Sequence, residues 1–454
     1  TNIKPASQIF GKGGEFMKYK LLSDFIAWAF PAKSDRIILR ELCRDVDSRF
    51  RAEKIHKKYS KIIKKLQADY KKRRLRVVFL ISDCSKWQYD SVFEIFKNDE
   101  NFEPLILIEP LDVLLKKESS NLDYKKILKS NLDFFKNQGF NVQYAFDIQK
   151  EKYIDLKKFN PDIVFYQQPY GIPKCHDADK VSNFALCFSA AYGSCISNGK
   201  NEYIEPLFKE VYRYFVDNDY AKANLELHGC KKENIIVSGQ SKSDAYLKPV
   251  NYSNQIWKTE NKKRIIWAPH FSFSKNSTLK FGTFDLYYDF FLNYAKNHNE
   301  FEFIFKPHPE LFRFIVKDGL MSKAVADDYF KRWGELSNAQ VYEKGDYFDM
   351  FRTSDLLITD CNSFLFEYLP TLKPVIHLVN KYSVGFNPFG QMITKGYYEA
   401  EDEKEIEELI EKLLFKGNDV LFPIRQYTLA KITKNKTKNF SEIVFDEVRG
   451  VVGK

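Results

Sequence analysis

Short apolar runs rich in β-branched residues alternate with longer helical segments along most of the chain, and this alternation restricts the fold more than any other feature. Strands that alternate with helices at such spacing form parallel βαβ units. The sequence therefore predicts the α/β class with parallel sheets. The strand candidates span residues 76–81, 105–108, 141–144, 161–166, 210–216, 235–237, 264–268, 301–306, 339–342, 356–359 and 374–378.

A polar stretch at residues 248–263 lacks an apolar period and divides this pattern into two halves. We expect two Rossmann-like domains facing a cleft, one over residues 76–250 and one over residues 260–435. A C-terminal tail or helix would follow at residues 436–454. Residues 1–16 read as an appended tag, because a Gly-Gly-Glu-Phe linker precedes Met17.

The segment 17–75 is predicted to be helical and basic. Leu21, Phe25 and Ala29 form an apolar stripe at helical spacing, and residues 49–74 are mostly Lys, Arg and polar residues. One interpretation is an amphipathic helix that packs on the first domain. The other is a cationic helix that docks on anionic lipid.

The 454 residues include 71 Lys and Arg against 61 Asp and Glu, a net charge of +10. This balance favours an anionic partner, such as a phosphorylated substrate or an anionic membrane surface. A nucleic acid is not expected, since no nucleic-acid-binding motif is evident. Seven cysteines without a CxxC pair indicate reduced thiols in a cytoplasm. No run of 18 apolar residues exists, so a spanning helix is not predicted.

Polar side chains follow two of the predicted strands directly. His270 follows the strand at 264–268, and Lys306 and His308 follow the next strand, between prolines that fix the backbone. Ligands of open parallel sheets bind at the carboxyl ends of strands. We expect His270 to act as a general base and His308 with Lys306 to face a phosphate. The alternative is that these are ordinary loop residues.

A third polar segment runs from Ile358 to Glu367 and reads as strand, turn and helix. Asn362 or Ser363 is predicted to cap this helix, and the backbone N–H groups at a helix start bind anions. Together with Thr359 they would bind the donor phosphate. Glu367, one turn further along, would accept hydrogen bonds from ribose hydroxyls. An ordinary capped helix is the alternative.

The chain contains no HExxH zinc motif, no Walker phosphate loop and no GxGxxG fingerprint. Nucleotide hydrolysis and dinucleotide redox chemistry therefore rank low. No metal-ligand set is visible, so we expect a site without a cofactor, with a loosely bound Mg²⁺ as the open alternative.

These motifs together resemble the CDP-glycerol glycerophosphotransferases, which include teichoic-acid primases and polymerases and related capsule enzymes. The matching segments are Ala-Pro-His-Phe-Ser (268–272), Lys-Pro-His-Pro (306–309), Thr-Asp-Cys-Asn-Ser-Phe-Leu-Phe-Glu-Tyr (359–368) and the crossing motif Ser-Gly-Gln-Ser-Lys-Ser-Asp (238–244). The resemblance implies a GT-B-type fold with an N-terminal helical segment added.

The resemblance also implies transfer of an alditol phosphate, glycerol phosphate first, from a CDP-linked donor to a hydroxyl of a capsule, teichoic-acid-like or lipid-linked glycan, releasing CMP. His270 would take the acceptor proton, while His308, Lys306 and the helix start at Asn362 and Ser363 would hold the charge of CMP. Such enzymes are cytoplasmic and peripherally attached to the inner face of the cytoplasmic membrane.

The sequence departs from the family pattern in its first half. Gln-Gln-Pro-Tyr-Gly (167–171) and Ala-Tyr-Gly-Ser (191–194) stand where the family often has a Trp-His-Gly-Thr-type loop, and Cys361 and Asn362 replace a common Tyr-Ser pair. The acceptor and the transferred group therefore stay open. The alternatives are a nucleotide-sugar glycosyltransferase on the same fold, transfer of another substituted phosphoryl group, and a catalytically silent assembly partner.

Overall fold

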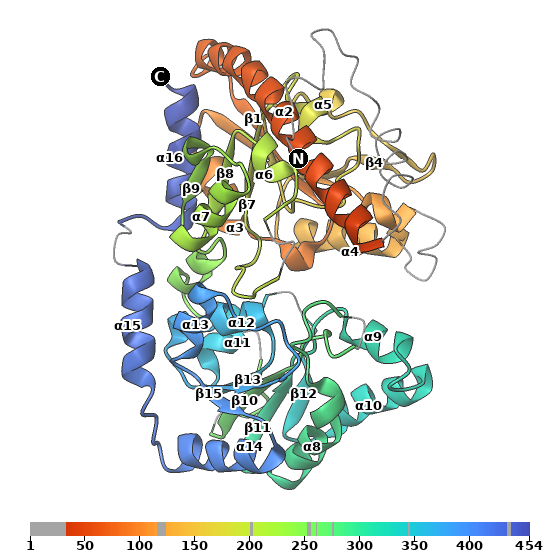
Figure 1. Cartoon of the computed structure of the whole chain (residues 1–454), viewed down its shortest axis with the longest axis vertical. Coiled ribbons are helices and arrows are strands. Elements are labelled where there is room, and N and C mark those ends of the chain that lie inside the picture. The colour runs from red at the N-terminus through yellow and green to blue at the C-terminus, as the bar shows by residue number, and fades with distance from the viewer. Residues whose placement is uncertain are drawn as a thin grey trace, which may run out of the picture.

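The computed structural model describes residues 33–115, 124–199, 203–251, 256–259, 261–274, 277–343, 346–433 and 437–454, with side chains from residue 48 onward except at position 113. The tag at 1–16 and the apolar stripe of Leu21, Phe25 and Ala29 lie outside these residues. Two bodies lie one above the other, and each is built on a parallel sheet (Figure 1). We call them the first and second lobes. The predicted α/β class is confirmed.

The first lobe contains a seven-stranded sheet in which every neighbouring pair is parallel. In spatial order its strands are β3 (Val142–Tyr144), β2 (Phe102–Ile108), β1 (Leu75–Ile81), β6 (Ile163–Tyr166), β7 (Leu186–Ala190), β8 (Arg213–Val216) and β9 (Ile235–Val237). Its helices are α2 (Lys33–Asp69), α3 (Asp90–Lys97), α4 (Tyr124–Asn137), α5 (Ala178–Val181), α6 (Leu207–Glu210) and α7 (Asp219–Leu227). A short hairpin joins β4 (Phe146–Asp147) to β5 (Lys152–Tyr153).

The second lobe contains a six-stranded parallel sheet. In spatial order its strands are β12 (Ala339–Val341), β11 (Phe301–Phe305), β10 (Lys263–Ala268), β13 (Leu356–Thr359), β14 (Val375–Leu378) and β15 (Tyr398–Ala400). Its helices are α8 (Phe284–Asn297), α9 (Leu311–Lys317), α10 (Lys323–Glu335), α11 (Phe348–Thr353), α12 (Asn362–Glu367), α13 (Pro388–Thr394), α14 (Glu403–Ile410) and α15 (Phe422–Thr433).

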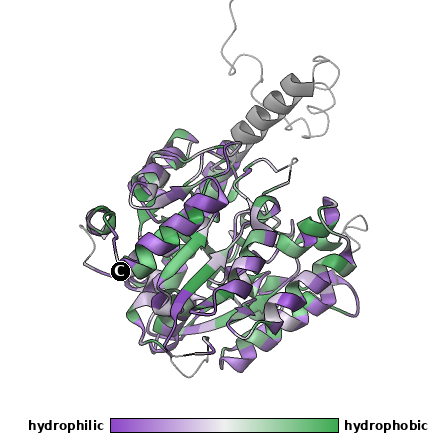
Figure 2. Ribbon diagram, turned by 90° about the horizontal axis from the view of Figure 1, so that it is seen from below, coloured by the Kyte–Doolittle hydropathy of each residue, from purple (hydrophilic) through white to green (hydrophobic). Residues whose placement is uncertain are grey.

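Both sheets are covered on their two faces, which explains why their strands read as apolar runs rather than as alternating patterns. All residues of β6 and β11 are buried. Figure 2 shows the hydrophobic residues concentrated on the strands and the hydrophilic ones on the outer helix faces. The two lobes have separate hydrophobic cores, and the second lobe has one on each face of its sheet.

Two elements differ from the sequence-based expectation. The buried strand β7 was not predicted, although it lies inside the first sheet between β6 and β8. The acidic segment 399–414 reads as a helix from the sequence, but its start is a strand, because Tyr398–Ala400 pairs with β14 as β15. Asp402 then accepts a hydrogen bond from the backbone N–H of Glu405, so the helix begins at Glu403.

The chain crosses between the lobes twice. The first crossing follows β9 and includes the short helix η7 (Ser243–Leu247). The second follows α15 and returns to the first lobe as α16 (Phe440–Val452), which lies beside α3 and α2 (Figure 1). Asp244 in η7 accepts hydrogen bonds from the backbone N–H groups of Phe440 (3.0 Å) and Ser441 (2.9 Å), so the two crossings are joined.

Helix α2 packs on the first lobe along its apolar side. Ile55, Tyr59, Ile62 and Leu66 are buried in the first-lobe core, and the Tyr59 hydroxyl donates to the Glu210 carbonyl (2.8 Å). The packing interpretation of residues 49–69 is therefore confirmed. No helix in the described part of the chain is both long enough and apolar enough to cross a membrane.

Candidate functional site

The two predicted histidines lie side by side in the second lobe. His270 and His308 follow the neighbouring strands β10 and β11, and their ring centroids are 4.8 Å apart at an angle of 72°. Phe271 lies against both rings, with centroids 4.4 Å from His270 and 4.6 Å from His308. The strands are parallel and adjacent, so their carboxyl ends bring the two loops together, as the sequence predicts.

Hydrogen bonds around His270 fix the position of its proton. Ser272 Oγ accepts from the backbone N–H groups of Phe281 and Gly282, both at 3.1 Å. Its own hydroxyl therefore donates to His270 Nδ1, 2.7 Å away, and the Ser272 N–H points to the same nitrogen at 3.3 Å. Neutral His270 then carries its proton on Nε2. A general base needs a lone pair there, so this tautomer favours a donor role for His270 over the expected base role.

His308 shows the same arrangement. Its Nδ1 accepts from the backbone N–H of Glu310 (3.1 Å), which leaves the proton on Nε2. Burial lowers the pKa of His270 to about 4. It also lowers the pKa of His308 well below 6.5, and repulsion from protonated His270, Lys306 and Lys86 adds to this effect. Both imidazoles are neutral at pH 7 and each presents one N–H.

Asp360 positions the His270 loop, a role that the sequence analysis missed. This fully buried carboxylate accepts from the His270 N–H (2.5 Å), the Thr283 N–H (2.5 Å) and the Thr283 hydroxyl (2.8 Å). It thereby ties the end of β13 to the loop after β10 and to the start of α8. Burial raises its pKa to about 7 against the opposing effect of these donors. Its place directly after a predicted strand, inside the third motif, was the available signal.

The histidines line a cavity of about 510 Å³ between the lobes, which we call the histidine cavity. The second lobe contributes Asn362 and Ser363 as well. From the first lobe come Tyr170 and Tyr192, whose hydroxyls lie 3.0 Å apart, and the loop at residues 193–197. These first-lobe residues include members of the two segments that depart from the family pattern, 167–171 and 191–194. Both segments therefore face the histidines across the cavity.

The predicted cap of α12 is wrong. Cys361 is the N-cap residue, no side chain makes a capping hydrogen bond, and Asn362 is already the first helical residue. Asn362 Oδ1 is buried without a hydrogen-bond partner in the described structure, and Ser363 Oγ lies 3.4 Å from Cys361 Sγ. Both side chains therefore lie at the histidine cavity, and neither of them caps the helix.

Lys306 and Thr359 do not line this cavity. The Thr359 hydroxyl is fully buried, donates to the Ala268 carbonyl (2.6 Å) and accepts from the Cys361 N–H (2.9 Å), so its bonds join two strand ends. Lys306 is buried, with its Nζ 5.8 Å from the Tyr342 ring centroid and 6.0 Å from that of Tyr347. Burial lowers its pKa to about 8.

Glu367 is also kept away from the cavity. The Tyr347 hydroxyl donates to its carboxylate, and Lys242 Nζ, from the first crossing, lies 3.9 Å away. Lys242 Nζ also donates to the Tyr347 hydroxyl (3.1 Å). Glu367 is 2% exposed in this structure, and its expected contact with ribose stays a prediction. Among the described residues, no three His, Cys, Asp or Glu side chains are grouped to hold a metal ion.

A known protein family matches the part of the chain that contains these residues. Residues 206–384 match the family model of the CDP-glycerol:poly(glycerophosphate) glycerophosphotransferases. The match covers 206–384 of a chain of 454 residues. The resemblance predicted from the motifs is confirmed there, and the match includes both histidine loops and α12.

Similar curated proteins are polymerases of teichoic acid. The teichoic acid ribitol-phosphate polymerase TarK of Staphylococcus aureus is 22% identical over 275 residues, 58% of this chain and 50% of that protein. The teichoic acid poly(ribitol-phosphate) polymerase of Bacillus spizizenii is 26% identical over 280 residues, 58% of this chain and 41% of that protein. The chain thus spans half or less of the length of these relatives.

Solved structures share the two-lobed arrangement. The UDP complex of Staphylococcus aureus MnaA aligns with a TM-score of 0.54 at 12% identity, over 83% of this chain and 96% of that one. UDP-GlcNAc 2-epimerase of Neisseria meningitidis aligns with a TM-score of 0.52 at 14% identity, over 83% of this chain and all of that one. The predicted GT-B-type fold is confirmed.

Proposed function

We propose that the protein transfers an alditol phosphate, glycerol phosphate or ribitol phosphate, from a CDP-linked donor to a hydroxyl of a teichoic-acid-like or lipid-linked glycan. The observation that carries the proposal is the pair of neutral histidines 4.8 Å apart in an inter-lobe cavity, within the region that matches the family. The acceptor hydroxyl oxygen attacks the phosphorus that bears the alditol, the bond from that phosphorus to the bridging oxygen of CMP breaks, CMP leaves with that oxygen, and the acceptor proton passes to solvent.

The residues at the cavity suit stabilisation of phosphate charge. Phosphoryl transfer is accelerated mainly by positioning and by groups that stabilise charge in the transition state. The Nε2–H groups of His270 and His308 are two such donors, held in place by Ser272 and Glu310. Ser363 adds a hydroxyl beside them. His270 acts in this scheme as a hydrogen-bond donor to the transferred phosphate.

We further propose that the reaction takes place at the inner face of the cytoplasmic membrane. The apolar side of α2 is buried in the lobe, so attachment would rest on its charge alone. Lys57, Lys61, Lys64 and Lys65 are exposed on the outer side of this helix. A lipid-linked acceptor would be presented at such a surface.

A donor screen tests the proposed transfer. The purified protein is incubated with CDP-glycerol, CDP-ribitol or UDP-GlcNAc and an acceptor glycan, with and without EDTA, and the released nucleotide is identified. We expect CMP from one CDP-alditol, and a loss of at least 100-fold in His270→Ala and in His308→Ala. Release of UDP from the sugar nucleotide would show glycosyl transfer instead. Sensitivity to EDTA would show a metal requirement.

A further inference from the structure

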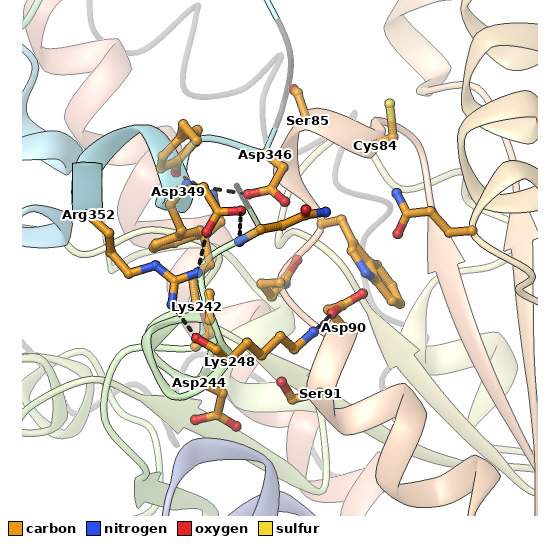
Figure 3. Close-up of a pocket in the computed structure, with 18 of the residues that line it drawn as sticks. Cys84, Ser85, Asp90, Ser91, Lys242, Asp244, Lys248, Asp346, Asp349 and Arg352 are labelled. Atoms are coloured by element: carbon orange, nitrogen blue, oxygen red, sulfur yellow. Dashed lines mark hydrogen bonds and ion pairs between the residues drawn. The ribbon is translucent and has the colours of Figure 1, made fainter. Parts of the chain in front are cut away.

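A second cavity between the lobes, of about 280 Å³, has no role in the proposed transfer so far. We call it the second cavity. Figure 3 shows Cys84, Ser85, Asp90 and Ser91 of the first lobe facing Asp346, Asp349 and Arg352 of the second, with Lys242, Asp244 and Lys248 from the first crossing. All three parts of the chain that meet between the lobes therefore contribute to it.

Unpartnered buried polar atoms gather at this cavity. Trp87 Nε1 and Gln88 Oε1 from the first lobe and Arg352 Nε from the second are buried without a hydrogen-bond partner in the described structure, and all three residues line the cavity. Gln88 is 3% exposed, and its amide nitrogen is held by the Gln167 carbonyl (2.7 Å). Its oxygen is therefore fixed as an unused acceptor. An unsatisfied buried polar group costs stability unless a ligand completes it.

Most of the charges around the cavity are already neutralised. Lys248 pairs with Asp90, and Arg352 pairs with Asp349, as Figure 3 shows. Asp244 is held by the two N–H groups at the start of α16. Lys242 Nζ lies 3.9 Å from the Glu367 carboxylate, so among the described lining residues the carboxylate of Asp346 remains, and burial raises its pKa. The cavity consequently offers donors and acceptors while its remaining charge is negative, which favours a neutral, hydroxyl-rich ligand over a phosphate.

The size and position of the cavity restrict the ligand further. Small-molecule pockets usually measure about 300–1,000 Å³, so this cavity holds a single small unit. Ser85 in η2 (Cys84–Lys86) lines the second cavity. The next residue, Lys86, lies over the ring of Tyr170, which lines the histidine cavity (5.5 Å from Nζ to the ring centroid). Neighbouring residues of η2 thus lie at the second cavity and beside a wall residue of the histidine cavity.

We propose that the second cavity binds one polyhydroxylated unit, an alditol or a sugar, of the chain whose end reacts in the histidine cavity. Trp87 Nε1 and Arg352 Nε would donate to hydroxyl oxygens of this unit, and Gln88 Oε1 would accept from a hydroxyl. The inference rests on the proposed function for the source of the unit. It assigns a binding subsite, formed by both lobes, to the acceptor.

Trp87→Phe tests the subsite because it removes the indole N–H and keeps an aromatic ring in the core. With short poly(ribitol phosphate) as acceptor, whose ribitol units carry several free hydroxyls, we expect the acceptor KM to rise about threefold to tenfold, the worth of one hydrogen bond. The donor KM and the affinity for CMP should not change. Trp333→Phe is the matched control, since Trp333 Nε1 is also buried and unpartnered but lines neither cavity.

Ser91→Phe provides a second variant that does not touch the core, because Ser91 lies at the surface of α3 and lines the cavity. It should block the subsite and raise the acceptor KM at least tenfold. An unchanged acceptor KM in both variants overturns the proposal, and so does a rise in the donor KM alone. Calorimetric titration of the same oligomers needs no turnover, so failure of the proposed transfer would be distinguished from failure of the subsite.

Discussion

At the scale of single residues, the proton on Nε2 decides what His270 can do. If a neutral N–H donor is required, activity should persist as the pH falls below 6.5, because the pKa of His270 is about 4. The acidic limb of the kcat/KM profile should then lie toward pH 4. Circular dichroism over the same range controls for unfolding, and an acidic limb centred at 6.5 would contradict the burial of His270.

His270→Gln separates the donor role from the base role. The glutamine amide N–H occupies nearly the place of Nε2–H but cannot take a proton. We expect His270→Gln to keep at least ten times the turnover of His270→Ala. Equal activities in the two variants would favour the general base that the sequence alone suggested.

Asp360→Asn addresses the residue that holds the His270 loop. The amide replaces one acceptor oxygen by a donor, so either the His270 N–H or the Thr283 N–H loses its partner. The free energy of unfolding should fall by about 1–3 kcal/mol. Turnover should fall with it, because the imidazole is displaced. Unfolding in denaturant and steady-state kinetics measure the two effects, and wild-type values in both would rule out a positioning role.

At the scale of elements, substitutions on α2 test the proposed membrane attachment. Its apolar side is buried, so deletion would expose the core of the first lobe, and substitution on the outer side is the cleaner experiment. The triple change Lys57→Glu, Lys61→Glu and Lys64→Glu should reduce binding to anionic vesicles about 100-fold or more, at about 1 kcal/mol per cation. Binding of the unchanged protein should weaken as salt shortens the Debye length.

Three exposed lysines of the second lobe, Lys296, Lys317 and Lys331, provide the control with the same change in net charge. Their substitution by glutamate should leave vesicle binding nearly unchanged. Equal vesicle binding by the two triple variants, or no binding of the wild type to anionic vesicles at low salt, would show that α2 has a structural role and does not attach the protein to a membrane.

At the scale of the whole molecule, the contact between the lobes positions one wall of the histidine cavity. Asn387 Nδ2 at the start of α13 donates to the carbonyls of Cys195 (2.9 Å) and Ser197 (3.2 Å) in the first lobe. Gly390 lies so close that an added Cβ would stand 2.2 Å from the Ile196 carbonyl oxygen. The loop at residues 193–197 is therefore held by the second lobe.

Gly390→Ala should push this loop away and cost about 1–3 kcal/mol, as overpacking usually does. We expect kcat/KM to fall at least tenfold, since the loop faces the histidines. Gly334→Ala is the matched control, because Gly334 is also helical and its added Cβ would meet nothing within 4 Å. Similar kinetics in the two variants would mean that the inter-lobe contact does not shape the cavity.

The sequence determined the elements that depend on local pattern. Apolar runs predicted the strands that precede His270, His308 and α12. The order of the parallel strands predicted that the two histidines lie close together. The sequence also predicted the α/β class and the resemblance that the family model finds over residues 206–384. These results follow because burial imposes a periodicity on the sequence, and because the carboxyl ends of parallel strands lie at one edge of a sheet.

Only the tertiary structure decided the roles of individual polar side chains. Thr359 and Glu367 occupy the right motif, yet their oxygens are engaged by Ala268 and by Tyr347 from other elements. Likewise the proton on His270 depends on Ser272, whose hydroxyl is held by residues 281 and 282. The hydrogen-bond partners of these side chains lie far from them in the sequence. A buried polar group bonds to whichever partner the fold brings within about 3 Å, so the spacing of residues along the chain cannot predict the partner.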